Sequence, residues 1–371
     1  MIAWLLISFF VLLFLGVPIA MSLGLSAIGG ILFLGGGSTV TIAQRMFEGM
    51  NSFALLAIPL YTFAGFTMSK GGISKRLMDF CYSIVGHIYG GLAHVNVLSS
   101  MIFAGISGSA VADTAGVSGM FMPEMIRKGY SKNFTVAVTA ISSTIGIIIP
   151  PSIPMVVIAG ICGISTGKLF LGGIIPGILC GLAQMIVSYF LAKKEGVPKE
   201  PGHFTIGPVL HGLWESWPAL LMPIIIVGTI TMGIVSPTEA GVIAVVYGLF
   251  AGGIIYRELK WEDIKFAFAE TVRTSGRIFI VIGAAKLYTV MLTTAGFDKW
   301  VAKTMLGFST NPTVILIVIL LIFFIVTMFM ESIATLTLFM PILYPIALGV
   351  GINPIVLSVL ITVVIGVRSE E

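Results

Sequence analysis

Charged residues are scarce in this chain of 371 residues. Asp, Glu, Lys and Arg together make up 10% of it, whereas an ordinary soluble domain has about 25%. Hydrophobic residues account for 57%. This balance excludes an ordinary soluble domain and predicts an all-α polytopic membrane protein. The formal net charge of +4 is small and sits in the loops, so it gives no indication of a nucleic-acid partner.

Residues for metal or nucleotide chemistry are also few. The three cysteines stand singly in apolar runs, and the four histidines form no metal-ligand spacing. The triple glycine at 35–37 is not followed by a lysine, as a phosphate-binding loop requires. No other ATP-binding motif is present. The sequence therefore predicts no organic cofactor and no ATP-driven transport by this chain.

The few basic residues fall in four clusters between apolar segments. These are Lys70 with Lys75 and Arg76, Arg127 with Lys128 and Lys132, Lys193 with Lys194 and Lys199, and the segment 257–277. Cytoplasmic loops are rich in Lys and Arg, so all four clusters are expected on the cytoplasmic side. An even number of membrane crossings must then separate neighbouring clusters.

Residues 1–200 are predicted to form the first of two inverted repeats. An apolar run at 2–34 provides one tilted span or two short ones, and 35–51 is expected as a loop in which Arg45 and Glu48 pair. The remaining predicted elements are a span at 52–69, an interfacial helix at 71–90, a re-entrant hairpin at 92–126, a broken helix at 133–166 and a helix at 169–192. The hairpin is required because 92–126 is too short for two full spans of about 20 residues.

Residues 201–371 are predicted to form the second, incomplete repeat. Its expected elements are spans within 214–256, an interfacial helix at 257–270, a span at 271–294, a polar loop at 295–310, a hairpin at 311–349 and the start of a second broken helix. Met-Pro pairs at 122–123 and 340–341 are each followed by two glycines at similar intervals. Such weak internal symmetry is typical of inverted-repeat transporters.

The stretch 103–152 carries the predicted ion site. A tip rich in Ser, Gly and Ala lies between apolar arms, and the Pro150-Pro151 pair breaks the following helix. Non-helical backbone at membrane depth is tolerated where protein, a cavity or an ion satisfies its polar groups. Sodium, as a hard cation, prefers oxygen ligands. The candidate sodium ligands are Ser107, Gly108, Ser109, Gly146, Ile149 and Pro150.

A carboxylate-binding site is predicted beside the ion site, because the N-termini of half-helices attract anions. Its candidates are Asp113, Thr144, Pro151, Ser152, Glu331 and Ser332. Asp113 is a carboxylate within a membrane segment, which is costly and commonly functional. The hydroxyls could instead bond back to their own helices, and Asp113 could cap the half-helix that follows the tip.

The chain resembles the large membrane subunit of tripartite ATP-independent periplasmic (TRAP) transporters along nearly its whole length. The matching segments are GVPIAMSLG (16–24), SFALLAIPLYTFAGFTMSKGGISKRL (52–77), FAGISGSAVADTAG (103–116), MPEMIRKGYS (122–131), TIGIIIPPSIPMV (144–156) and SPTEAGVIAVVY (236–247). The resemblance implies a sodium-coupled importer of the bacterial inner membrane that works by an elevator movement. It also implies a small four-helix membrane partner and a periplasmic binding protein that delivers an organic acid such as a C4-dicarboxylate or a sialic-acid-like carboxylate.

The end of the chain departs from that family. The second repeat is expected to continue after Gly366 with a second Pro-Pro break, but Val367 is followed by Arg-Ser-Glu-Glu. We therefore expect a truncated chain with an incomplete second ion site.

Two other functions fit parts of the sequence. Gly105-Ile-Ser107-Gly108 matches the GxSG of intramembrane serine proteases, a chemistry that also needs a histidine base near the serine. His87 and His94 precede the motif, and His203 and His211 lie in a linker, so no histidine follows on a later membrane helix. A passive channel is the second alternative, and it would conduct without sodium-driven uptake.

Overall fold

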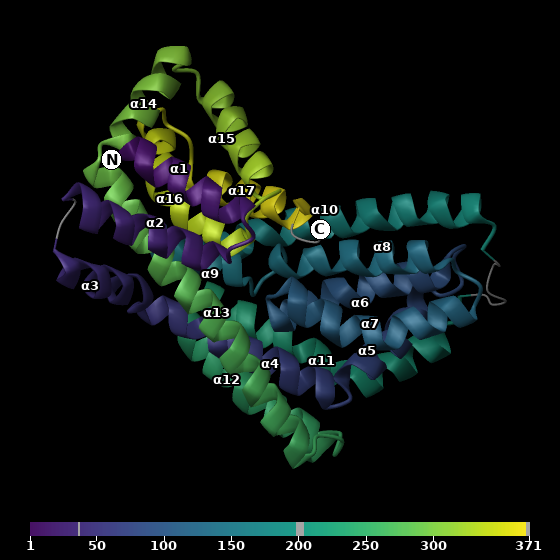
Figure 1. The fold of residues 1–371 in the computed structure, drawn as a ribbon. Coiled ribbons are helices and arrows are strands. Elements are labelled where there is room, and N and C mark those ends of the chain that lie inside the picture. Colours follow the sequence, from purple (N-terminus) through teal and green to yellow (C-terminus); the bar gives the residue numbers. More distant parts are fainter. Residues whose placement is uncertain (36–37, 198–203, 369–371) are drawn as a thin grey trace.

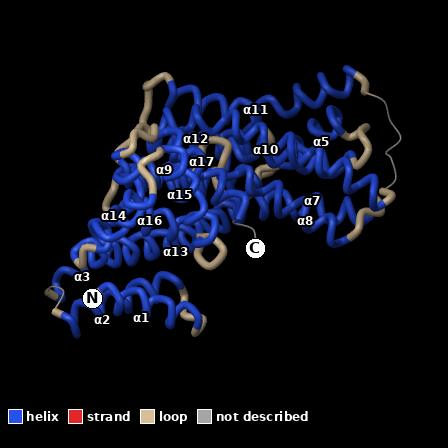
Figure 2. Tube along the Cα trace, turned by 90° about the horizontal axis from the view of Figure 1, so that it is seen from above, coloured by secondary structure: helices blue, strands red, loops and turns tan. Residues whose placement is uncertain are grey.

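The computed structural model describes residues 1–35, 38–197 and 204–368. Every regular element in that part of the chain is a helix (Figures 1 and 2). The predicted boundary between the repeats at 200 and 201 lies outside the described residues, as do Lys199, His203 and the last three residues.

The helices of the first half are, in order, α1 (Ile2–Phe14), α2 (Ile19–Leu34), α3 (Thr39–Met50), η1 (Phe53–Leu56), α4 (Ala57–Lys70), α5 (Ile73–Val85), α6 (Gly91–Ser107), α7 (Ala110–Arg127), α8 (Lys132–Ser143), η2 (Thr144–Ile147), α9 (Ile153–Cys162) and α10 (Thr166–Glu195). The second half contains α11 (Ile206–Thr231), α12 (Pro237–Phe250), η3 (Ala251–Ile255), α13 (Trp261–Thr294), α14 (Phe297–Phe308), α15 (Pro312–Val326), α16 (Ser332–Gly349) and α17 (Pro354–Arg368).

The apolar run at 2–34 consists of two short helices. Gly16, with φ of 81°, and Pro18 separate α1 from α2, and the two helices pack on each other. At 1.5 Å per residue, the 13 residues of α1 extend about 20 Å, less than the hydrocarbon core of a bilayer. Figure 2 shows this pair at the outside of the molecule.

Two groups of helices make up the rest of the fold. In the first, α6 is surrounded by α5, α7, α8 and α10, which lie side by side in Figure 1. In the second, the long helix α13 packs against α2, α3, α4 and α16. Helix α4 connects them, because it contacts α12 and α13 as well as α6 and α7.

Two segments predicted as loops are helices. Residues 39–50 form α3, capped by the Ser38 side chain, and 297–308 form α14. Both are amphipathic, with their polar residues spaced along one face, and a count of polar residues does not register that spacing. The predicted pair of Arg45 and Glu48 within α3 is confirmed, with Nη1 and Oε2 2.7 Å apart.

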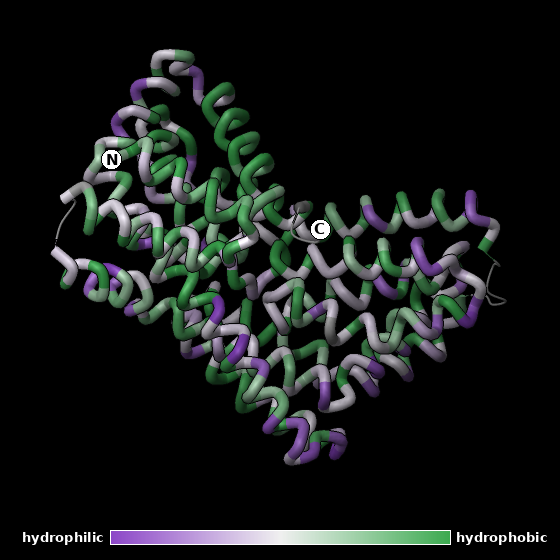
Figure 3. Tube along the Cα trace, viewed as in Figure 1, coloured by the Kyte–Doolittle hydropathy of each residue, from purple (hydrophilic) through white to green (hydrophobic). Residues whose placement is uncertain are grey.

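The predicted division near residue 270 is wrong, because α13 runs without interruption through 34 residues. Its length of about 51 Å exceeds the roughly 30 Å of a hydrocarbon core. Its charged first turns therefore extend beyond the apolar part of the fold. Figure 3 shows hydrophilic residues gathered where α12 leads into α13 and at the far end of the α5–α8 group.

Six helical segments in the described part of the chain are long and apolar enough to cross a membrane. They are Phe53–Lys70, Thr166–Glu195, Ile206–Thr231, Pro237–Ile255, Trp261–Thr294 and Ser332–Gly349. Shorter apolar helices include α6, α9, α15 and α17. The fold is therefore that of a multi-pass membrane protein that contains both full-length spans and shorter apolar helices.

Candidate functional site

The first hairpin turns within two residues. Helix α6 ends at Ser107, Gly108 adopts a left-handed conformation with φ of 64°, and α7 begins at Ala110. Ser109 is extended and caps α7, its Oγ accepting from the amide of Ala112 at 3.5 Å. A Cβ at Gly108 would lie 2.6 Å from the carbonyl oxygen of Pro151. Glycine is thus required at 108 both by the backbone angle and by the space.

The predicted broken helix is present. Helix α8 ends at Ser143, η2 continues to Ile147, and α9 starts at Ile153. The peptide bond between Pro150 and Pro151 is cis. Ser152 closes the break, because its hydroxyl donates to the carbonyl of Ile147 at 2.5 Å and accepts from the amide of Met155 at 3.3 Å.

The hairpin tip and the break in the helix are in contact. The amide of Ile153 donates to the carbonyl of Gly108 at 3.1 Å. A Cβ on Gly146 would lie 3.4 Å from the carbonyl group of Ser109. Six of the predicted residues are thus brought together, namely Ser107, Gly108, Ser109, Gly146, Pro151 and Ser152.

Two oxygen atoms at this contact, the Gly146 carbonyl and the Ser107 hydroxyl, lack a strong hydrogen bond within the described part of the chain. Pro150 has no amide hydrogen to donate to the carbonyl of Gly146, and the Ile149 amide is directed to Ile145 at 2.9 Å. The Gly146 carbonyl therefore lacks its normal helical donor. The Ser107 hydroxyl is fully buried, and its contacts with the backbone of Ser109 are both 3.4 Å long. These two oxygens have the chemistry that a sodium ion requires.

Two of the predicted hydroxyls have structural roles in the helix. Thr144 donates back to the carbonyl of Ile141 at 2.7 Å, and Ser152 caps α9. Asp113 is fully buried in the first turn of α7, where its own amide donates to Ser109 at 3.0 Å. An acid at this position interacts favourably with the positive end of the helix dipole.

The second hairpin has a cap of its own. Glu331 is exposed and caps α16, accepting from the amides of Ile333 at 3.0 Å and Ala334 at 3.2 Å. Ser332 is the first residue of that helix, which packs on α9 and α13. The hydrogen bonds given for Glu331 stay within its own helix, and its place beside the first hairpin in a substrate site stays a prediction.

Sequence reasoning missed two features that hold the site. On α4, a Cβ at Gly65 would lie 3.1 Å from that of Ser107. On α6, the Asn96 amide donates to Thr139 Oγ1 at 2.9 Å and accepts from Ser142 Oγ at 3.0 Å. The signal for the second feature was a single asparagine within an apolar helix, where an unpaired amide would be costly.

The geometry does not support a protease. Ser107 and His94 lie on the same helix 13 residues apart, which corresponds to about 20 Å along its axis. His94 is buried, and its Nε2 contacts the carbonyl of Tyr89 at 3.2 Å. A serine nucleophile needs its base within about 3 Å. His211 lies on α11, not in a linker, and its Nε2 contacts Glu215 at 3.2 Å. The His87 ring lies 5.8 Å from the ring of Phe204, and His203 lies outside the described residues.

A multi-pass helical protein with a hairpin tip docked on a broken helix belongs to the class of membrane permeases. The sequence matches the family model described as the DctM component of the tripartite ATP-independent periplasmic transporter, over residues 6–369. The chain therefore belongs to the DctM family of TRAP transporters. This is a family of transporter subunits, not of enzymes.

Individual relatives agree with this assignment. The chain is 37% identical, over 96% of its length, to an isethionate TRAP transporter permease from Oleidesulfovibrio alaskensis, of which it covers 56%. It is 36% identical to the sialic acid large permease SiaM of Vibrio cholerae and to the C4-dicarboxylate large permease DctM of Pseudomonas aeruginosa, covering 80% of each. The chain thus spans little more than half of the first relative and four fifths of the other two.

Proposed function

We propose that this chain is the membrane translocation subunit of a sodium-coupled transporter that imports a small carboxylate. The contact between the Gly108 carbonyl and the Ile153 amide carries the proposal. It joins the hairpin tip that carries Ser107 to the helix break in which the Gly146 carbonyl lacks its helical donor, and a Cβ on Gly146 would lie 3.4 Å from the Ser109 carbonyl group at that tip. Broken helices and half-helix ends of this kind are how secondary transporters build ion and substrate sites.

The two hairpins are proposed to enter the bilayer from opposite sides and to move with the broken helix as one elevator body. The short apolar helices α6 and α15 support this, since each is too short to span the hydrocarbon core comfortably. The names of the relatives support isethionate, sialic acid or a C4-dicarboxylate as the class of substrate.

Partners and location are proposed from the same family. A tripartite periplasmic transporter is expected to combine this chain with a small four-helix membrane subunit and a periplasmic binding protein, in the bacterial inner membrane. The exposed apolar side chains of the described helices are suited to contact with lipid and with such a subunit.

Thermal unfolding in sodium against equal potassium tests the ion site. A ligand that binds only the folded state raises its stability, so sodium is expected to raise the melting temperature of the wild type. The Ser107→Ala variant should lose that increment. Ser131→Ala is the matched control, because Ser131 caps the far end of α8 and its loss should lower stability equally in both salts.

Uptake into proteoliposomes with the predicted partners separates a carrier from a channel. We expect accumulation of labelled carboxylate only with an inward sodium gradient. Passive equilibration without the gradient would favour a channel. In the unfolding experiment, a sodium-dependent rise in melting temperature that persists in Ser107→Ala would show that Ser107 is not part of the ion site.

A further inference from the structure

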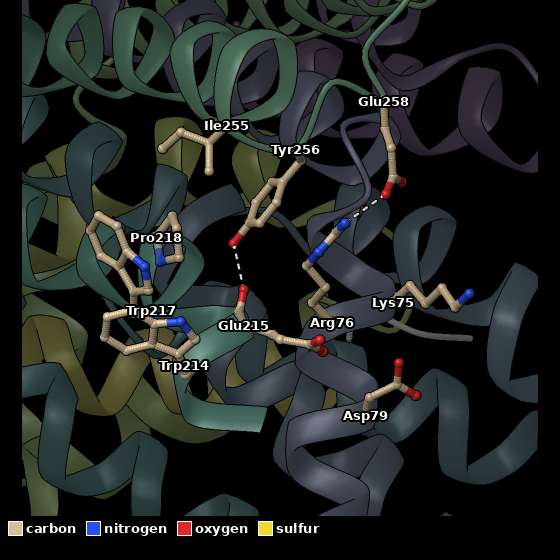
Figure 4. A pocket seen from close by; sticks show the side chains of 10 residues that line it. All are labelled: Lys75, Arg76, Asp79, Trp214, Glu215, Trp217, Pro218, Ile255, Tyr256 and Glu258. Atoms are coloured by element: carbon tan, nitrogen blue, oxygen red, sulfur yellow. Dashed lines mark hydrogen bonds and ion pairs between the residues drawn. The ribbon is translucent and has the colours of Figure 1, made fainter. Parts of the chain in front are cut away.

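A cavity of about 430 Å³ lies between α5, α11 and the segment from the end of η3 to Glu258 (Figure 4). Its wall is built around Arg76. The guanidinium pairs with Glu258 at 2.8 Å, stands over the Tyr256 ring at 4.1 Å from its centre, and donates to the carbonyl of Gly72 at 2.9 Å. Arg76 and Glu258 neutralise each other, so neither is available to a charged ligand.

Backbone contacts fix the three elements around this cavity. The Ser216 hydroxyl donates to the carbonyl of Arg76 at 2.9 Å, which joins α11 to α5. The Tyr256 hydroxyl donates to the carbonyl of Glu215 at 3.1 Å, which joins the residue after η3 to α11. The cavity is therefore a built feature of the fold and does not depend on a loose loop.

Three further charges line the cavity, namely Lys75, Asp79 and Glu215. Burial raises the pKa of the Asp79 carboxyl, and the like charge of Glu215 raises it further, whereas Lys75 and Arg76 lower it. Asp79 and Glu215 thus interact with each other across the cavity. His211 Nε2 lies 3.2 Å from Glu215 on its outer side and is a partner only when protonated.

Two exposed tryptophans complete the lining. Trp214 and Trp217 lie three residues apart on α11, so they share a face, and they are 76% and 46% exposed. Indole rings concentrate at the depth of lipid headgroups. Their faces also attract cations. The cavity therefore combines the Lys75 ammonium, two carboxylates and the aromatic rings of a residue type that concentrates at the depth of lipid headgroups.

This combination selects a zwitterion. A simple anion would meet two carboxylates, and a simple cation would meet Lys75. We propose that the cavity binds the headgroup of an amine-bearing zwitterionic phospholipid, with Lys75 on the phosphate and Asp79 and Glu215 on the primary ammonium. A primary ammonium donates hydrogen bonds to carboxylates, whereas a quaternary choline ammonium cannot, so ethanolamine fits better than choline.

Lipid titration of the delipidated full chain in detergent, read by native mass spectrometry, tests this proposal. Phosphatidylethanolamine should bind about tenfold more tightly than phosphatidylcholine or phosphatidylglycerol with the same acyl chains, because charge-assisted hydrogen bonds are strong. The double variant Asp79→Asn with Glu215→Gln should reduce that affinity to the phosphatidylcholine level. Lys75→Ala should weaken both zwitterionic lipids, since both present a phosphate.

The controls are Lys132→Ala and Glu262→Gln, which remove exposed charges on α8 and α13 and should leave lipid binding unchanged. If the double variant fails to fold, the lipid affinities of Lys75→Ala test the proposal, because this lysine is exposed and its truncation should leave the fold intact. Equal affinity for the three lipids, or a preference that none of these substitutions alters, would overturn the proposal.

A water-soluble competitor distinguishes the headgroup from the acyl chains. Millimolar glycerophosphoethanolamine should displace phosphatidylethanolamine from the wild type, and glycerophosphoglycerol should not. A lipid preference that persists in the presence of the soluble headgroup would locate recognition in the acyl chains and contradict the assignment to this cavity.

Discussion

The hairpins α6–α7 and α15–α16 turn in different ways. The first turns through Gly108 and Ser109 alone, and its tip is buried against the break between η2 and α9. The second turns through the five residues 327–331, of which Met328 and Phe329 are about half exposed. The first tip is held by a contact with another element, whereas the second is held by the Glu331 cap of its own helix.

The difference follows from side-chain size. Small residues at the first tip allow two backbones to approach within hydrogen-bonding distance, as the bond from the Ile153 amide to the Gly108 carbonyl shows. The second tip carries the larger side chains Met328, Phe329 and Met330, which take up more space than glycine and serine. An ion site built mainly from backbone oxygens is therefore expected at a tip of glycine and serine, which is why the sodium proposal rests on the first hairpin.

The largest expected effect comes from Gly108→Ala. The left-handed backbone costs about 1–2 kcal/mol for a residue with a Cβ, and the contact of 2.6 Å with Pro151 adds about 1–3 kcal/mol of overpacking. Gly351→Ala is the matched control after the second hairpin, because Gly351 has φ of 83° and open space around it. Its cost should be that of the backbone alone.

Unfolding in mixed detergent micelles measures both variants. We expect Gly108→Ala to lose clearly more stability than Gly351→Ala, and to lose the sodium increment as well. Equal losses would mean that the first tip is not docked as described.

The next effect concerns two asparagines. Asn96 lies buried in the first hairpin and bonds to Thr139 and Ser142, whereas the Asn311 side chain is an exposed cap at the start of the second. Replacing Asn96 by Ala should cost about 2 kcal/mol through lost hydrogen bonds and a cavity. Replacing Asn311 by Ala should cost about 1 kcal/mol. The reverse order of melting temperatures would show that the buried network contributes little.

The first hairpin and the broken helix could be predicted from sequence, because residue type and the spacing of basic clusters determine where they lie. The hairpin at 92–126 followed from the lack of room for two spans, and the structure turns at Gly108 and Ser109 within the predicted tip. The break at Pro150-Pro151 followed from the missing amide hydrogens. These are local consequences of residue type, so they need no knowledge of packing.

Other features depend on tertiary contacts and were missed. Helices α3 and α14 were predicted as loops, since polar residues on one face of an amphipathic helix resemble a loop when they are only counted. The pairing of Asn96 with Thr139 joins residues 43 positions apart, and no periodicity reveals such a partner. The cavity beside Arg76 requires three elements to meet, which a linear pattern does not specify.

The smallest expected effect tests the second tip. Glu331 caps α16 with its side chain, so Glu331→Ala should lower stability by about 1 kcal/mol, the usual cost of losing a cap. Glu331→Asp retains a carboxylate with a shorter reach, and Asp is a preferred capping residue, so it should recover most of that stability. Melting curves of both variants give this comparison.

Transport by the same two variants then separates capping from substrate binding. If Glu331 only caps α16, uptake should follow stability, and Glu331→Asp should transport almost as well as the wild type. If its carboxylate also meets the substrate or an ion, the shortened side chain should lower uptake although the fold is intact. That result would give the second hairpin a role like that of the first despite its different turn, and it would contradict the view that only a small-residue tip builds a site.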